Sequence, residues 1–138
     1  MTVVLDASAA IEFIRKAEKA DLIEAYLLHS DLIISSDLYK AECANAIWKM
    51  ARAGMVNRDD LNTLMSKCNK LIYSFIDIGE NCAESLFEAV KFNHPVYDML
   101  YFTLARRTGA VMLTMDKRLT KLCKENGIDC PLLGTIST

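Results

Sequence analysis

Short apolar runs separated by longer helical patterns are the feature that most constrains how this chain can fold. Three of the runs are predicted to be buried strands from their length and apolar content, and a fourth alternates only weakly. A fifth run contains Pro131, which is tolerable in an edge strand. The five segments are TVVL (residues 2–5), DLIIS (31–35), AVMLT (110–114), the weaker SFIDI (74–78) and the C-terminal IDCPLL (128–133).

Helical patterns fill the intervals between these runs. Residues that favour helix starts, such as Asp37, precede them, and glycines such as Gly54 and Gly109 follow them. The predicted helices cover residues 8–28 with a break allowed near 16–19, 38–54, 57–72, 80–92, 97–107 and 117–126. Strands that alternate with helices predict an α/β fold with a parallel sheet, and the length fits a single domain, residues 1–138.

The composition excludes several other classes of protein. Hydrophobic residues make up 52% of the chain and charged residues 25%, as is usual for globular domains. No apolar run approaches the ~18 residues of a membrane span, and the start MTVVLDASAA lacks the basic region of a secretory signal. We therefore expect a cytoplasmic protein that does not enter a membrane. A net charge of −2 argues against holding nucleic acid by bulk charge, but not against a local metal site.

The cysteines are predicted to be small buried hydrophobic residues. Their number is odd, and no two of them form a Cys-x-x-Cys pair. In a cytoplasmic chain this pattern favours neither disulfides nor a zinc site. The five residues are Cys43, Cys68, Cys82, Cys123 and Cys130.

Four acidic residues fall where the predicted strands end. Asp6 directly follows the first strand, and Asp116 lies just past AVMLT. Glu42 lies about one turn into the helix that follows the second strand, and Asp98 begins the helix that leads into AVMLT. Because sites in parallel α/β folds form at the carboxyl ends of the strands, we expect these four side chains to share one edge of the sheet.

Each acid has a structural explanation as well. Asp6 and Asp116 are well placed to cap the helices that follow them, and Asp98 could cap the helix that it begins. Glu42 shares a stripe with Asn45, Lys49 and Arg52 that is consistent with a solvated helix face. The conjunction of four acids at one sheet edge nevertheless favours a functional site over four separate structural roles.

Clustered carboxylates repel one another, so a cation is expected among them. No lysine or histidine occupies a matching strand-end position, and oxygen ligands suit Mg²⁺ or Mn²⁺. Such a metal supports attack of water on a phosphodiester, with no serine or cysteine nucleophile. Ser8 and Asn45 are candidate hydrogen-bonding partners of the acids.

Four motifs together resemble the PIN-domain family, and within it the VapC-type toxin ribonucleases of toxin–antitoxin pairs. They are VVLDASA with Asp6, YKAECANAIWK with Glu42 and Asn45, VYDMLYFTLA with Asp98, and LTMDKRL with Asp116. The resemblance spans about residues 3–133. It implies a three-layer α/β/α domain with a central parallel sheet of about five strands.

The same resemblance implies a Mg²⁺- or Mn²⁺-dependent endoribonuclease. Carried over by position, Asp6, Glu42, Asp98 and Asp116 are its catalytic and metal-binding acids, with Asn45 and Thr114 as supporting polar residues. The expected partners are RNA, a second copy in a homodimer, and a small antitoxin that inserts a segment near the acids. Lys117 and Arg118 follow Asp116 where some relatives place a further acid, so the use of one or two metals stays open.

Other functions fit parts of the pattern. An α/β phosphatase of the aspartate-nucleophile type needs a second acid two residues after the first, where this chain has Ser8. A receiver domain needs paired acids near the first strand, which are missing. A PIN-like binding module without catalysis is disfavoured because all four acids are present.

Several residues near the acids have weaker assignments. Arg15, Lys40, Lys117 and Arg118 are candidates for contacts with RNA phosphates, and ordinary surface charge explains each equally well. His94 precedes Pro95, where a structural role is favoured over catalysis.

Overall fold

Among the residues that the structure describes, four parallel strands form a sheet at the centre of the domain. The computed structural model describes residues 1–131 and 133. Its strands are β1 (Thr2–Leu5), β2 (Leu32–Ser36), β3 (Ser74–Ile76) and β4 (Val111–Leu113), in the spatial order β3-β2-β1-β4. All three strand pairs are parallel, with Val4 opposite Ile34 in β2 and Met112 in β4. The predicted α/β fold with a parallel sheet is therefore confirmed.

The C-terminal run does not add a regular fifth strand in the part that is described. Residues 128–131 and 133 have no strand geometry, and Leu132 lies outside the described residues. The backbone N–H of Met112 donates to the carbonyl of Asp129 at 2.8 Å, so the segment lies beside β4. Pro131 has no N–H with which to extend this pairing. Within residues 128–131 and 133, the predicted edge strand is thus reduced to one backbone hydrogen bond with β4, and the sheet of about five strands that we expected has four strands in the described part of the chain.

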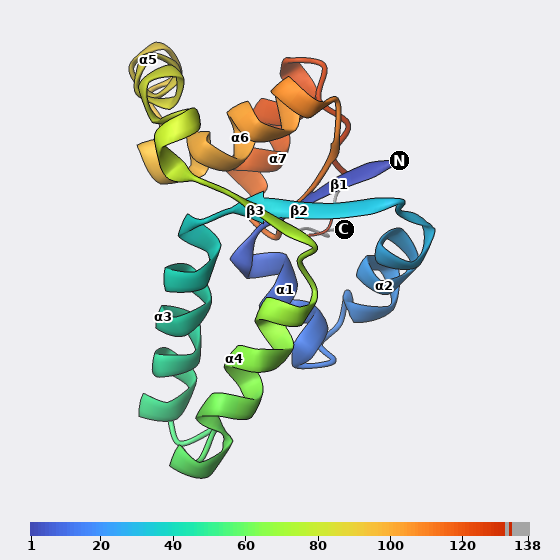
Figure 1. Cartoon of the computed structure of the whole chain (residues 1–138), viewed down its shortest axis with the longest axis vertical. Coiled ribbons are helices and arrows are strands. Elements are labelled where there is room, and N and C mark those ends of the chain that lie inside the picture. Colours follow the sequence, from blue (N-terminus) through green and yellow to red (C-terminus); the bar gives the residue numbers. More distant parts are fainter. Residues whose placement is uncertain (132, 134–138) are drawn as a thin grey trace.

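In the part of the chain that the structure describes, seven α-helices cover the two faces of the sheet. Figure 1 shows α1 to α4 on one face and α5 to α7 on the other, which confirms the expected three layers. One layer contains α1 (Ala7–Ile14), α2 (Ala20–His29), α3 (Leu38–Arg52) and α4 (Leu61–Lys70). The other contains α5 (Cys82–Phe92), α6 (Val96–Thr108) and α7 (Lys117–Glu125). Short 3₁₀ turns, η1 (Arg58–Asp60) and η2 (Ile78–Glu80), precede α4 and α5.

The long helical pattern near the N-terminus is interrupted where the sequence allowed a break. Lys16 has a left-handed φ of 55°, which ends α1. Glu12 then accepts a hydrogen bond from the backbone N–H of Lys19 at 3.0 Å, which satisfies a free donor at the start of α2. α1 is therefore a short helix whose first turn lies at the sheet edge.

Helix α6 is buried in the core and leads directly into β4. The seven consecutive residues from Met99 to Ala105 are all buried, so this helix is covered on every side. Gly109 ends it with a left-handed φ of 66°, and the chain turns directly into β4. Because a side chain at this φ is strained, glycine allows the tight return. Asp98 and the strand leading to Asp116 are thereby held by one compact unit.

The cysteines follow the prediction with one exception. Cys43, Cys68, Cys123 and Cys130 are buried in the core, whereas Cys82 at the start of α5 is exposed. The prediction of burial was wrong for Cys82, because the first turn of α5 faces solvent. Within the described residues, no helix has both the length and the apolar character that crossing a membrane requires.

Candidate active site

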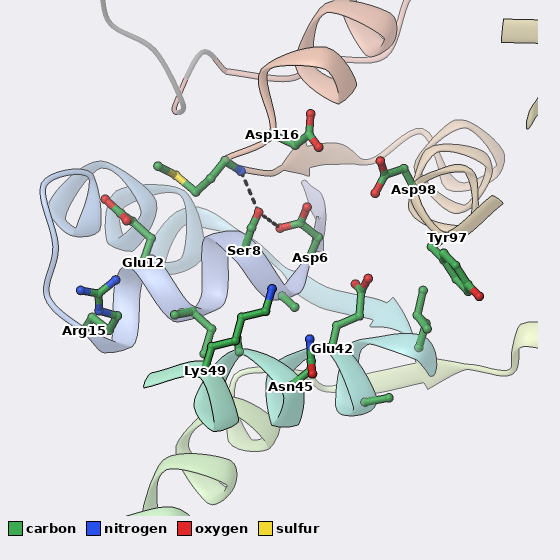
Figure 2. Close-up of a pocket in the computed structure, with 16 residues that line it drawn as sticks. Asp6, Ser8, Glu12, Arg15, Glu42, Asn45, Lys49, Tyr97, Asp98 and Asp116 are labelled. Carbon is green, nitrogen blue, oxygen red and sulfur yellow. Dashed lines mark hydrogen bonds between the residues drawn. The ribbon is translucent and has the colours of Figure 1, made fainter. Parts of the chain in front are cut away.

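The four acids predicted from the strand ends line one pocket of about 580 Å³. Asp6 follows β1, Asp116 precedes α7, Glu42 lies in the second turn of α3, and Asp98 lies in the first turn of α6. Figure 2 shows their carboxylates around a common space, although they come from both helical layers. The sheet edge therefore brings together residues that are up to 110 positions apart in the chain (6 to 116).

Asp6 is the most buried of the four, with 6% of its surface exposed. Its Oδ1 accepts hydrogen bonds from the backbone N–H of Ala9 at 2.9 Å and from the hydroxyl of Ser8 at 2.7 Å. Asp6 is thus the N-cap of α1, as its structural explanation predicted. Capping uses one oxygen and fixes the direction of the other, so it does not compete with a role in the pocket.

Asp116, like Asp6, both caps a helix and lines the pocket. Its Oδ1 accepts from the backbone N–H of Leu119 at 3.0 Å, which caps α7. Its own backbone N–H donates to the hydroxyl of Thr114 at 3.0 Å. The hydroxyl of Ser8 accepts from the N–H of Met115 at 2.9 Å and lies 3.4 Å from that of Thr114. Ser8 and Thr114 therefore tie the loop after β4 to the start of α1, which fixes Asp116 relative to Asp6.

Glu42 is oriented from the opposite helical layer. The hydroxyl of Tyr101, which is almost completely buried, donates to Oε1 of Glu42 at 2.6 Å. Asn45 and Lys49 line the pocket with Glu42, but Arg52 stacks over the ring of Trp48 at 4.5 Å. The residues proposed as one solvated helix face are therefore divided: Glu42, Asn45 and Lys49 line the pocket, whereas Arg52 does not.

Asp98 is held by a histidine one turn before it. Nε2 of His94 lies 2.8 Å from Oδ2 of Asp98, and His94 is 8% exposed. Pro95 occupies the N-cap position of α6 and forms no side-chain cap, so Asp98 does not cap this helix. The contact gives His94 a role that the sequence analysis missed. The signal was present as the spacing of four residues between His94 and Asp98.

The hydrogen bonds leave carboxylate oxygens available to the pocket. Glu42, Asp98 and Asp116 each bind a protein donor through one oxygen, and their second oxygens form no hydrogen bond with residues 1–131 and 133. Asp6 receives two donors on a single oxygen, and the hydroxyl of Thr114 also interacts with this carboxylate. The protein thus orients all four acids without fully satisfying them.

Burial and mutual repulsion make this site unfavourable for four negative charges. Burial raises the pKa of Asp6 to about 6, although hydrogen bonds from Thr114, Ala9 and Ser8 oppose the shift. Burial also raises the pKa of Glu42 and of Asp98 above their ordinary values. Neighbouring charges add to each shift: Glu42 acts on Asp6, Asp98 on Glu42, and Asp116 on Asp98. A bound cation or bound protons would relieve this repulsion.

The donor set fits a hard divalent cation better than zinc. The pocket lining offers carboxylate and amide oxygens but no cysteine or histidine. In the described part of the chain, no three His, Cys, Asp or Glu side chains lie close enough to hold one ion together. Mg²⁺ commonly takes only one or two carboxylates and completes its shell with water and phosphate oxygens. One or two of the four acids could therefore serve as direct ligands of such a cation.

Comparison with known proteins gives matches over most of the chain. The family model of the PIN domain matches residues 3–125. A protein named Ribonuclease VapC3, from Pyrobaculum aerophilum, is 26% identical over 126 residues, which cover 88% of this chain and 94% of that protein. The crystal structure of PAE2754 from Pyrobaculum aerophilum superposes with a TM-score of 0.71 at 26% identity, covering 94% of this chain and 92% of that one.

Proposed function

This chain belongs to the PIN domain family, and from its acidic pocket we propose that it is a metal-dependent endoribonuclease that hydrolyses RNA phosphodiester bonds. The name of the similar Ribonuclease VapC3 supports RNA as the substrate and supports a role as the toxin of a type II toxin–antitoxin pair. The observation that carries the proposal is the set of four oriented acids. Glu42, Asp98 and Asp116 each present an unbonded oxygen to the pocket that Asp6 also lines.

Asp6, Glu42, Asp98 and Asp116 surround the place where Mg²⁺ or Mn²⁺ would be held, with one or two of them as direct ligands and the others acting through water. When bound, the metal lowers the pKa of a water ligand and offsets the negative charge that develops on the phosphate. Tyr101 and His94 keep the carboxylates of Glu42 and Asp98 in fixed directions. Ser8 and Thr114 hold the ends of β1 and β4 together, which maintains the spacing between Asp6 and Asp116. Asn45 adds an amide group on the same wall of the pocket, where it can donate to a phosphate oxygen.

The proposed protein partners are a small antitoxin and a second copy of the chain in the cytoplasm. An unneutralised acidic pocket attracts a basic side chain, which supports inhibition by an antitoxin segment inserted there. Exposed apolar side chains on α5, namely Leu86, Phe87 and Val90, support a protein contact on that helix. Purification of a free and fully active monomer from the native host would count against both partners.

The alternative function, an α/β phosphatase, lacks the second acid that its chemistry requires. Ser8 occupies the place of the required second acid, and its hydroxyl is engaged by both Asp6 and the backbone of Met115. No observation favours a receiver domain or an inactive module over a nuclease.

The test is cleavage of an end-labelled RNA in Mn²⁺ or Mg²⁺, in EDTA, and after metal is restored to the EDTA sample. We expect cutting only when metal is present. If water is the nucleophile, the ribose 2′-hydroxyl is not needed, so a single 2′-deoxy substitution at the cut position should leave cleavage in place. Cleavage that persists in excess EDTA, or that is abolished by the 2′-deoxy substitution, contradicts the proposed chemistry.

A further inference from the structure

The pocket has a charge gradient along its length. Asp98 lies at one end, and Arg15 lies at the other beyond Glu12, with Lys49 on α3 between them (Figure 2). Arg15 ends α1 and Lys49 lies in the fourth turn of α3, and these two helices pack against each other. The two cations therefore stand on opposite walls of one groove that is continuous with the acidic site.

Arg15 and Lys49 differ from the other cations near the acids because their side chains have no partner among the residues that the structure describes. Lys40 forms an ion pair with Asp37 at 3.0 Å and also lies over the ring of Phe75 at 4.4 Å. Arg118 donates to the carbonyl of Asn93 at 3.4 Å, and Lys117 is not part of the pocket lining.

Arg15 and Lys49 are exposed, and neither forms a salt bridge or a side-chain hydrogen bond with residues 1–131 or 133. Even the carboxylate of Glu12 is engaged elsewhere, since it accepts from the backbone N–H of Lys19. Two unpaired cations in one groove are suited to an external anion.

The position of the pair sets which anion fits. Lys49 lies seven residues after Glu42, which is about 10 Å along the axis of α3. This spacing places Lys49 farther along the groove than Glu42, where its ammonium group can meet the next phosphates of the same strand. Ile11 and Ala46 also line this pocket and add apolar surface that a base or ribose can contact.

We infer that Arg15 and Lys49 form a phosphate-binding subsite that guides single-stranded RNA along the groove between α1 and α3, so that a neighbouring linkage reaches the acids. This inference rests on the proposed nuclease function. It gives a role in the groove to Lys49, which the sequence analysis placed on a solvated helix face, and it selects Arg15 from the four cations considered from the sequence. Binding at this subsite supplies affinity and register, whereas the acids supply the chemistry.

The test compares Arg15→Ala, Lys49→Ala and the double variant with wild type in cleavage of a labelled RNA oligonucleotide. Each single change should raise KM two- to fivefold, on the scale of one exposed ion pair, with a smaller effect on kcat. The dependence of binding on salt should also weaken, by about 0.7 in the slope of log K against log salt for each lost phosphate contact. Lys91→Ala is the matched control, because Lys91 is an exposed lysine on α5 that does not line the pocket.

A scan of the oligonucleotide with single uncharged methylphosphonate linkages locates the contact. A methylphosphonate at the linkage that Lys49 contacts should weaken binding to wild type but not to Lys49→Ala. This linkage should lie one or more positions away from the cut. Variants that cleave with wild-type KM and salt dependence overturn the subsite and leave the nuclease proposal intact. If wild type with metal cuts no RNA, both proposals are overturned.

Discussion

Nε2 of His94 lies 2.8 Å from Oδ2 of Asp98, and this contact leaves the second carboxylate oxygen of Asp98 directed to the pocket. A histidine that fixes a metal-binding carboxylate typically changes metal affinity 10- to 100-fold when it is removed. We therefore predict that His94→Ala weakens Mn²⁺ binding by about this factor, measured by calorimetric titration. His94→Gln should restore part of the affinity, because its amide can donate to the same oxygen.

The second histidine of the chain is the control for this prediction. His29 is exposed on α2, and its Nδ1 lies 2.7 Å from the carbonyl oxygen of Ala25, so His29→Ala should bind Mn²⁺ as wild type does. Equal Mn²⁺ affinity in wild type and His94→Ala would limit His94 to a packing role.

Tyr101→Phe removes the hydroxyl that orients Glu42 from the other layer. We expect the free energy of unfolding to fall by about 1 kcal/mol, as for other lost hydrogen bonds. Because the hydrogen bond from Tyr101 lowers the pKa of Glu42, its loss should raise that pKa further. Protons compete with the metal for Glu42, so Mn²⁺ binding should weaken more when it is measured at pH 6 than at pH 8.

Tyr39→Phe is a matched variant for the same experiment. Tyr39 is also buried, and its hydroxyl donates to the backbone carbonyl of Cys68 at 2.6 Å, away from the acids. It should lose similar stability but keep its Mn²⁺ affinity at both pH values. A parallel loss of metal binding in the two variants would indicate general loosening of the fold.

Asp6→Asn should change how the stability of the metal-free protein depends on pH. Burial raises the pKa of Asp6 from 3.8 to about 6, so the folded protein binds more protons than the unfolded chain between these values. The free energy of unfolding of wild type therefore falls as the pH rises from about 4 to about 6, and it stays lower at higher pH. Asparagine retains the capping oxygen but cannot ionise. The variant should be more stable than wild type in EDTA at pH 7.5, by roughly 2–3 kcal/mol, and nearly equal at about pH 4.

Urea denaturation in EDTA at the two pH values measures this difference. Asp59→Asn is the control, since Asp59 is an exposed acid in η1 outside the pocket. A stability difference that does not change with pH would show that Asp6 is ionised equally in the folded and unfolded chain.

The exposure of Cys82 predicts a single reactive thiol. Under native conditions a thiol reagent such as dithiobisnitrobenzoate should modify one cysteine rapidly, and Cys82→Ser should remove that fast phase. The other four thiols are buried and should react only after denaturation. Rapid reaction of two or more thiols in the native protein would contradict the packing of the core.

The gathering of acids at one edge of the sheet could be predicted from the sequence, because it depends only on where the strands end. Asp6 and Asp116 follow apolar runs, and parallel strands bring such ends together whatever the details of packing. Their capping roles were also predictable, and the structure has them alongside the pocket. What appeared as two competing explanations is one arrangement in which a single oxygen serves the helix.

Contacts between side chains on distant elements could not be predicted from the sequence. Tyr101 and Glu42 are 59 residues apart on opposite layers, so no local spacing relates them. Lys49 lies on the same helical face as Glu42, but only the position of α1 decides whether that face meets solvent or a groove. The C-terminal run has strand composition, yet residues 128–131 make only one backbone contact with β4. Pairing depends on register and available donors, which composition does not specify.

The central claim is that the four acids bind a divalent metal, and thermal unfolding in Mn²⁺ and in EDTA tests it most directly. Binding to the folded state alone stabilises wild type by ~2.7 kcal/mol at a hundredfold excess over Kd, so its Tm should rise clearly with Mn²⁺. Asp98→Asn should fold normally, with Asn still able to bind His94, but should lose most of this rise, while Asp59→Asn keeps it. Identical Mn²⁺-induced rises in Tm for wild type and Asp98→Asn would contradict the metal site.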